Sequence, residues 1–278
     1  MRYGLPYLGS KSRICNWLMD HLPSAENFVD LFAGGCAVAH CAMLSGKYRK
    51  FFVNDIQNDV IELFLSCIRR ELPDDCRRSI GRLEFQTRKK DPFVRLVWSY
   101  SSNSFDYIYG QSFEDIKRTV HDMLVSDDYE ERYALYHRFI LLLERSQIPL
   151  HSLENVQSLV NLNALFAIAA DERLRTMEII PSSLDYADVS FPPGSTVYAD
   201  PPYRQTQGYP TGMFDHARFY DWLRRTPFPV YVSEYEMPDD FVCIAELDHQ
   251  GFNSKMITDR LFLHERFVSE RLEQPNLF

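Results

Sequence analysis

The feature that most constrains the fold is a β-loop-α-β pattern near the N-terminus. Residues 28–32 form a short apolar run that is broken by Ala33, Gly34 and Gly35, and residues 37–44 then have the composition of a helix. A second apolar run at 51–53 ends in two polar residues. Two strands joined through a helix are the repeating unit of parallel sheets. The pattern therefore predicts an α/β fold.

The alternation of strand and helix patterns resumes after a long region that lacks it. From about residue 158 onward, apolar strand patterns and one amphipathic helix pattern alternate, at 197–200, 216–225, 230–233, 242–247 and 260–268. The region between lacks strand patterns and favours helices at 61–70, 113–125 and 129–145. We therefore expect a catalytic domain built from 1–56 and 158–278, with a mainly helical insertion at 57–157.

Composition narrows the class of protein. The chain has 278 residues, 45% hydrophobic and 25% charged, which is typical of a globular protein. Its net charge of −9 argues against a non-specific nucleic-acid coat protein, although a local basic face remains compatible with it. The six cysteines form no C-x-x-C pair and the histidines have no H-x-x-x-H spacing, so we expect reduced thiols and no metal. No apolar run reaches membrane-spanning length, which predicts a cytoplasmic protein, as monomer or weak dimer.

The glycine-containing turn after the first strand is a candidate nucleotide site. Open α/β sheets bind nucleotides at the carboxyl ends of their strands, and glycine lets the backbone approach a ligand closely. The segment Asp30–Gly35 matches neither G-x-G-x-x-G nor a P-loop, so an ordinary tight turn is an equal alternative. Asp55, at the end of the next strand, is suited to binding both ribose hydroxyls. Its alternative role is to cap the helix that follows.

The strongest signal is the tetrapeptide Asp200-Pro201-Pro202-Tyr203, which follows an apolar strand. The two prolines hold the chain extended, so that the Asp200 carboxylate and the Pro201 carbonyl form a fixed pair of acceptors. Such a pair suits an aromatic amino group, whose two hydrogens it binds as charge develops on the nitrogen. Tyr203 is suited to stacking on an extruded base. The alternative is a rigid turn without chemical function.

Together with two further segments, these motifs resemble the Dam-type, alpha-group (D12 class) family of DNA N6-adenine methyltransferases. The segment 6–11, P-Y-L-G-S-K, resembles the family's N-terminal cofactor motif, and 30–36 resembles its D-x-F-x-G-x-G loop. Asp55 matches the ribose-binding acid and 200–203 the catalytic tetrapeptide. One position departs from the pattern, because Cys36 stands where the family has a second glycine.

The resemblance implies an S-adenosylmethionine-dependent methyltransferase (Rossmann-like) sheet of seven strands, one of them antiparallel, with a helical target-recognition insertion. It implies S-adenosylmethionine as cofactor and no metal. The catalytic residues would be Asp200, Pro201, Pro202 and Tyr203. The cofactor would be bound by Tyr7, Lys11, Asp30, Phe32, Ala33, Gly34, Gly35, Asp55, Asp185, Tyr186 and Asp200.

The insertion is where this family reads double-stranded DNA. Its stretch 69–90 is rich in Arg and Lys, which suits phosphate contacts, although a solvated helical face is an equal alternative. A polar, aromatic segment follows, in which Asn and Gln are suited to pairing with adenine. The loop after the tetrapeptide is a candidate for closing on DNA. The residues predicted to bind DNA are Arg77, Arg78, Arg88, Lys89, Lys90, Asn103, Tyr109, Gln111 and Arg204.

The function predicted from these residues is site-specific methyl transfer to N6 of a flipped adenine in DNA, by a restriction-companion, orphan or phage-type enzyme. Methylation of RNA adenine or of a protein glutamine amide is an alternative, because related tetrapeptides serve those acceptors. A second alternative is a DNA-binding relative with impaired catalysis, which the departure at Cys36 keeps open.

Overall fold

The computed structural model describes residues 2–103, 105–146, 148–203, 214–250 and 256–268. The chain divides into two compact units. The sheet unit consists of Arg13–Ala33, Val38–Asn58 and the chain from Met177 onward. The helical unit consists of the N-terminal segment up to Ser12, the short piece Gly34–Ala37 and Asp59–Thr176.

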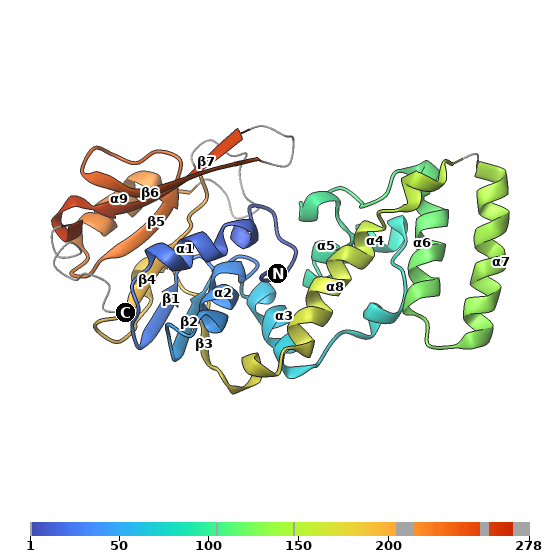
Figure 1. Ribbon diagram of the computed structural model, residues 1–278, viewed down its shortest axis with the longest axis horizontal. Helices are drawn as coiled ribbons and strands as arrows, with labels where there is room; N and C mark the ends of the chain where they lie inside the picture. The colour runs from blue at the N-terminus through green and yellow to red at the C-terminus, as the bar shows by residue number, and fades with distance from the viewer. Residues whose placement is uncertain (1, 104, 147, 204–213, 251–255, 269–278) are drawn as a thin grey trace. The chain divides into compact units, whose positions relative to one another are not determined.

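The sheet unit is built on a seven-stranded sheet (Figure 1). In spatial order the strands are β3 (Glu178–Ser182), β2 (Lys50–Asn54), β1 (Asn27–Asp30), β4 (Thr196–Ala199), β5 (Val230–Glu234), β7 (Met256–His264) and β6 (Phe241–Gln250). The first five strands pair in parallel, and β7 is antiparallel to both β5 and β6. The predicted methyltransferase sheet, with one antiparallel strand, is therefore confirmed.

The central strands β1, β4 and β5 are buried along their whole length. This agrees with their almost continuous apolar sequences, since a parallel sheet is covered on both faces. On one face, helix α9 (His216–Arg225) packs Phe219 and Leu223 against Val29, Val197 and Val232. The short helix α1 (Cys15–His21) and α2 (Ala37–Ser45) come before and after β1 in the chain.

The helical unit contains α3 (Asn58–Arg69), α4 (Arg82–Arg88), α5 (Pro92–Trp98), α6 (Gln111–Val125), α7 (Tyr129–Ser146) and α8 (Gln157–Ala170), joined by turns and 3-10 segments. Helix α6 packs along α7, and α5 packs against α8. Large side chains that are fully buried, among them Phe85, Phe93 and Trp98, form its core. No helix among the described residues combines the length and apolar character needed to cross a bilayer.

Several elements differ from expectation. Helix α8 and strand β3 have no counterpart among the predicted elements. The helix predicted at 129–145 is present as α7, and none of its residues is buried. The insertion at 57–157 stays a prediction about domains. The helical unit itself extends to Thr176, because α8 packs against α5.

Candidate active site

Three aspartates lie at the carboxyl ends of neighbouring parallel strands. Asp30 is the last residue of β1, Asp55 comes directly after β2, and Asp200 directly after β4. Asp30 pairs in register with Val53 on one side and with Tyr198 on the other. The sheet therefore brings these carboxylates to one edge, where open α/β sheets bind their ligands.

Asp30 lies in a strongly perturbed electrostatic environment. Its side chain is buried, and burial together with the charges of Asp200 and Asp55 raises its pKa to about 8, against the lowering effect of the Phe32 and Ala39 backbone amides. Its Oδ1 atom has no hydrogen-bond partner among the described residues. A buried acid next to like charges favours the arrival of a cation, which would stabilise its ionised form.

Asn54 fixes the edge of the sheet, a role that the sequence analysis did not assign. Its side-chain amide donates to the carbonyls of Leu31 and Leu184, each at 3.0 Å, and its Oδ1 accepts from the Ser182 hydroxyl at 2.7 Å and from the Leu184 amide at 3.0 Å. Its own carbonyl accepts from the backbone N–H of Ala33 at 2.9 Å. One buried side chain thus ties together the ends of three strands. The feature of the sequence that could have indicated this role is a polar residue at the end of an apolar strand.

Asp55 lies in the turn that leads from β2 to α3. Its Oδ1 accepts from the Gln57 amide at 2.8 Å, in the turn that precedes α3 at Asn58. The side chain is half-buried. This bond belongs to the turn before α3, so both the capping of α3 and the binding of ribose by Asp55 stay predictions.

The tetrapeptide leaves the sheet at the end of β4, between strands β1 and β5 in the spatial order. Pro201 is buried, and Pro202 and Tyr203 are half-buried. The Tyr203 ring meets the Tyr235 ring edge-on, with centroids 4.6 Å apart and planes at 81°. Burial, followed by the charge of Asp200, raises the pKa of Tyr203 well above its ordinary value.

Residues at the end of β5 and on the neighbouring β7 complete this neighbourhood, and the sequence analysis missed their contribution. Glu234 is buried, and its Oε1 accepts from the Tyr235 amide at 2.8 Å. The Tyr235 carbonyl accepts from Arg260 at 2.8 Å. Arg260 thus holds the backbone of the tyrosine that contacts Tyr203.

The Asp185–Tyr186 pair lies beside an aromatic cluster. Arg218 of α9 donates to both Asp185 oxygens, at 2.7 and 2.9 Å, and stands 5.1 Å from the centre of the Tyr186 ring. Tyr186 is buried against Phe32, with ring centroids 5.6 Å apart, and against Trp222. Arg218, whose side chain is largely exposed, therefore holds Asp185 in place. A cofactor contact by Asp185 and Tyr186 stays a prediction.

In the helical unit, the N-terminal motif packs on the glycine turn. A Cβ added at Gly34 would lie 2.9 Å from the Tyr7 ring, and one at Gly35 would lie 2.5 Å from Tyr7 Cβ. The Leu5 amide donates to the Gly35 carbonyl at 2.7 Å. The glycines are therefore needed to admit Tyr7. Half-buried Lys11, the last residue of the motif, begins the 3-10 turn Lys11–Arg13.

Cys36 occupies a backbone conformation that favours glycine. Its φ is +59°, and its side chain is fully buried, with Sγ 3.9 Å from the Gly34 carbonyl oxygen. The departure noted in the sequence therefore falls at a left-handed position, where a side chain costs about 1–2 kcal/mol. The loop accommodates the Cys36 side chain in a fully buried position.

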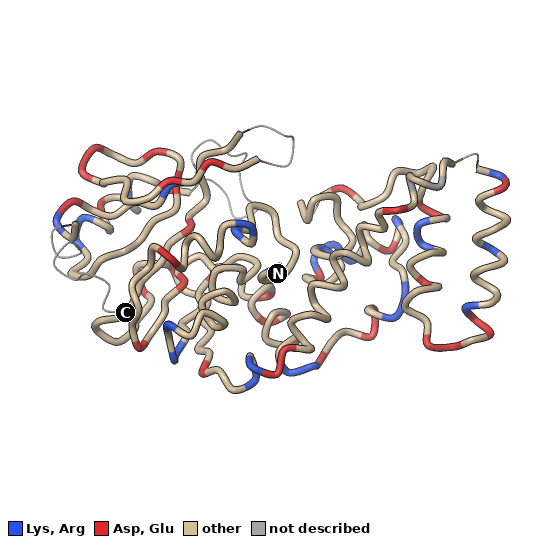
Figure 2. The backbone as a smooth tube through the Cα atoms, viewed as in Figure 1, with Lys and Arg blue, Asp and Glu red and all other residues tan. Residues whose placement is uncertain are grey.

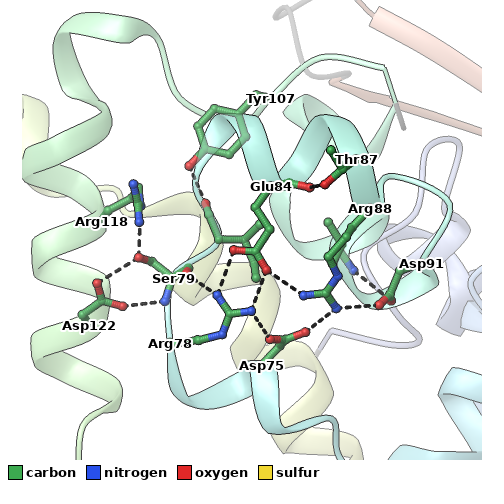
Figure 3. A network of polar contacts seen from close by, with 12 residues as sticks. Asp75, Arg78, Ser79, Glu84, Thr87, Arg88, Asp91, Tyr107, Arg118 and Asp122 are labelled. Atoms are coloured by element: carbon green, nitrogen blue, oxygen red, sulfur yellow. Dashed lines mark hydrogen bonds and ion pairs between the residues drawn. The ribbon is translucent and has the colours of Figure 1, made fainter.

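The basic stretch of the helical unit separates into two groups. Arg78 and Arg88 form ion pairs with Asp75, Glu84 and Asp91 (Figure 3). The predicted phosphate contacts of these two arginines therefore compete with strong internal partners. Arg77, Lys89 and Lys90 are exposed and make no ion pair with a described residue. Figure 2 shows acidic and basic residues interleaved along this unit.

The other predicted DNA contacts are placed differently. Gln111 is exposed at the start of α6, and the Asn103 side chain bonds Asp106 at 3.0 Å. Tyr109 is buried, with its hydroxyl 2.7 Å from Ser158 Oγ, so this position argues against the base contact predicted for it. Arg204, and the loop proposed to close on DNA, lie outside the described residues. Within the described ranges, no group of three or more His, Cys, Asp or Glu residues is arranged to hold a metal ion.

Comparison with known proteins agrees with this geometry. A family model described as D12 class N6 adenine-specific DNA methyltransferase matches residues 7–221. This span includes every motif from Tyr7 to Tyr203. The chain is also similar to the retron Ec67 DNA adenine methylase of Escherichia coli, with 28% identity over 216 residues that cover 76% of this chain and 67% of that protein.

Proposed function

Because the chain belongs to the D12 class of N6 adenine-specific DNA methyltransferases, we propose that it transfers a methyl group from S-adenosylmethionine to N6 of an adenine flipped out of double-stranded DNA. The observation that carries this proposal is the position of Asp200–Tyr203 at the end of β4, beside the carboxylate of Asp30. We expect action in the cytoplasm of a bacterial cell, as a host-encoded or phage-encoded enzyme.

The sheet edge fits this cofactor. When bound, S-adenosylmethionine supplies a methyl group on a sulfonium, together with an ammonium. Both cations suit a site in which Asp30 has an unpartnered buried oxygen and lies close to Asp55 and Asp200. Asp55 has the position expected for binding ribose hydroxyls. Phe32, Ala33, Asp185 and Tyr186 are further candidates for cofactor contact.

In the helical unit, Tyr7 and Lys11 are the candidates for cofactor contact. Tyr7 packs against Gly34 and Gly35. Its side chain occupies the space that a Cβ atom at either glycine would need. We propose that the glycines serve the cofactor by fixing Tyr7.

The tetrapeptide is suited to binding the target amino group. Asp200 and the Pro201 carbonyl would accept its two hydrogens, while Pro202 fixes the backbone between them and Tyr203. Tyr203 would stack on the extruded base, and Tyr235 supports the Tyr203 ring from its edge. Positioning of the nitrogen in line with the methyl donor is then the main contribution of the protein.

The test is methyl transfer from labelled S-adenosylmethionine to unmethylated genomic DNA, with RNA and protein acceptors in parallel and N6-methyladenine mapped by sequencing. We expect transfer to DNA, and its loss by more than about 100-fold in Asp200→Ala, because the acceptor pair is broken. The exposed Asp239→Ala is the matched control and should retain activity. Transfer to RNA or protein alone, or equal activity of Asp200→Ala, would contradict the proposal.

A further inference from the structure

Helix α4 presents one fully exposed face. Leu83, Gln86 and Thr87 are exposed, and they are spaced i, i+3 and i+4, so they lie on the same side of the helix. Leu83 is 85% exposed, more than any other large hydrophobic residue among those described. Lys89 and Lys90, both exposed, follow the last turn. This face contains no acidic residue.

The opposite face of α4 packs against other residues of the helical unit along its whole length. Phe85 is fully buried and packs against Tyr107, with ring centroids 5.6 Å apart. Arg82 lies over the same ring at 4.8 Å and pairs with Glu114 at 3.0 Å. The Glu114 carboxylate also accepts from the Arg82 amide at 3.0 Å, which satisfies one of the free N–H groups at the start of the helix.

A chain of ion pairs locks the orientation of the helix (Figure 3). Glu84 accepts from Arg78 at 2.6 Å and from Arg88 at 2.7 Å. Arg88 also reaches Asp75 at 2.5 Å and Asp91 at 2.8 Å. The carboxylates around the helix are thus paired internally, while Arg77, Lys89 and Lys90 make no ion pair with a described residue.

We infer that α4 is a base-reading helix, which enters the major groove of DNA with Leu83, Gln86 and Thr87 toward the base edges and Lys89 and Lys90 toward the phosphates. An α-helix with its side chains is about 10–12 Å wide, and the major groove about 12 Å. A glutamine amide can pair with both polar groups of an adenine edge, and apolar side chains can contact the thymine methyl. The Thr87 hydroxyl donates to the Glu84 carbonyl at 2.8 Å, so its methyl group is the part left for contact.

This inference rests on the proposed function, since it names the surface that selects the DNA site. It also assigns the two groups of basic residues different roles. Arg78 and Arg88 hold the helix, whereas Lys89 and Lys90 bind the DNA backbone. The two roles predict different effects of substitution.

The first experiment measures which sites are methylated. Wild type, Gln86→Ala and Leu83→Ala methylate unmodified genomic DNA, and N6-methyladenine is mapped by sequencing. We expect each variant to accept a changed base at one position of the wild-type site, with discrimination there reduced roughly 10- to 100-fold. Arg138→Ala on α7, also exposed, is the matched control and should leave the site unchanged. Retention of wild-type selectivity by both α4 variants would overturn the inference.

The second experiment measures binding to a duplex of random sequence at several salt concentrations. The double variant Lys89→Ala/Lys90→Ala should bind all duplexes more weakly, and the slope of log affinity against log salt should fall by roughly two, one for each lost phosphate contact. Arg138→Ala should not change the slope. An unchanged slope in the double variant contradicts the inference alone, while a wild type that neither binds nor methylates DNA contradicts the proposed function as well.

Discussion

At the scale of single residues, the glycine turn shows how a departure from a motif is accommodated. Cys36 has a φ of +59°, a conformation that glycine adopts freely and other residues adopt at a cost. Its side chain is nevertheless fully buried and fills space in the helical unit. Backbone strain and packing therefore act in opposite directions at this position.

This opposition predicts a small effect of Cys36→Gly. Relief of the left-handed conformation stabilises the fold by about 1–2 kcal/mol. Loss of the buried thiol and the greater freedom of glycine in the unfolded chain offset most of this, so we expect a net change within about 1 kcal/mol. Cys36→Val keeps a buried side chain but is β-branched, and should cost more than about 2 kcal/mol. Urea unfolding of the three proteins measures both. Equal stability of Val and Gly variants would show that φ is not the deciding factor.

At the scale of secondary-structure elements, the success of sequence reasoning followed the strength of periodicity. The strands that end in Asp30 and Asn54, and the one directly before Asp200, were predicted to within one or two residues, because each is a short apolar run closed by polar or proline residues. Helix α8 was missed because it is apolar around most of its circumference, so no helical period stands out. Strand β3 was missed because of Pro181, which is tolerated there only because β3 is an edge strand.

The site was predictable to a similar extent. Residues with a chemical signature, such as Asp200 and Tyr203, could be named from the sequence. Glu234 and Tyr235 could not, because their relation to Tyr203 arises only when β4 and β5 pair. The pairing of Arg78 and Arg88 with acids was equally hidden, since a basic stretch looks the same whether its charges are free or neutralised.

Asn54 gives a prediction about how the strand ends are held together. Asn54→Ala would leave the carbonyls of Leu31 and Leu184 and the Leu184 amide without the bonds that the side chain now makes. Buried groups left unsatisfied cost about 1–3 kcal/mol each, so we expect a loss of about 2–4 kcal/mol after partial relaxation. Chemical denaturation measures it. Asn155→Ala, whose side chain is exposed, should change stability by less than about 0.5 kcal/mol. A similarly small change at Asn54 would exclude the strand-tying role.

At the scale of the whole molecule, two buried ionisable groups set opposite limits on the pH range of stability. In the helical unit, burial lowers the pKa of His121 to about 4, and its Nδ1 lies 2.7 Å from Ser158 Oγ. In the sheet unit, burial raises the pKa of Asp30 to about 8. Each group favours its neutral form in the fold, so acid opposes folding through His121 and base opposes it through Asp30.

The acid limit is testable through His121. The unfolded chain takes up its proton near pH 6.5, while the folded chain resists protonation until about pH 4. The contribution to stability is therefore complete above pH 6.5 and is lost as the pH falls toward 4, by up to about 3 kcal/mol. His121→Gln should flatten this part of the stability profile, measured by urea unfolding between pH 7.5 and 4.5. The exposed His151→Gln should follow wild type. An unchanged slope in His121→Gln would assign the acid sensitivity to other groups.

The basic limit couples stability to the proposed cofactor. Without a ligand, the Asp30 carboxyl is mainly protonated at pH 7, because its pKa is raised to about 8 by burial and by the charges of Asp200 and Asp55. Its contribution to folding is complete below about pH 4 and declines as the pH rises through 8. A cation bound beside it would stabilise the carboxylate and lower this pKa. Binding of S-adenosylmethionine at pH 7 should therefore release a proton, approaching one per site.

Calorimetry in two buffers of different ionisation enthalpy measures that proton directly. S-adenosylhomocysteine is the matched ligand, because it lacks the sulfonium charge, and we expect it to release a smaller fraction of a proton. Asp30→Asn should abolish the difference between the two ligands and should also remove the decline of unliganded stability between pH 4 and 8. If both ligands release the same number of protons from the wild type, the sulfonium is not bound next to Asp30, and the ammonium that both ligands carry is the cation that Asp30 holds.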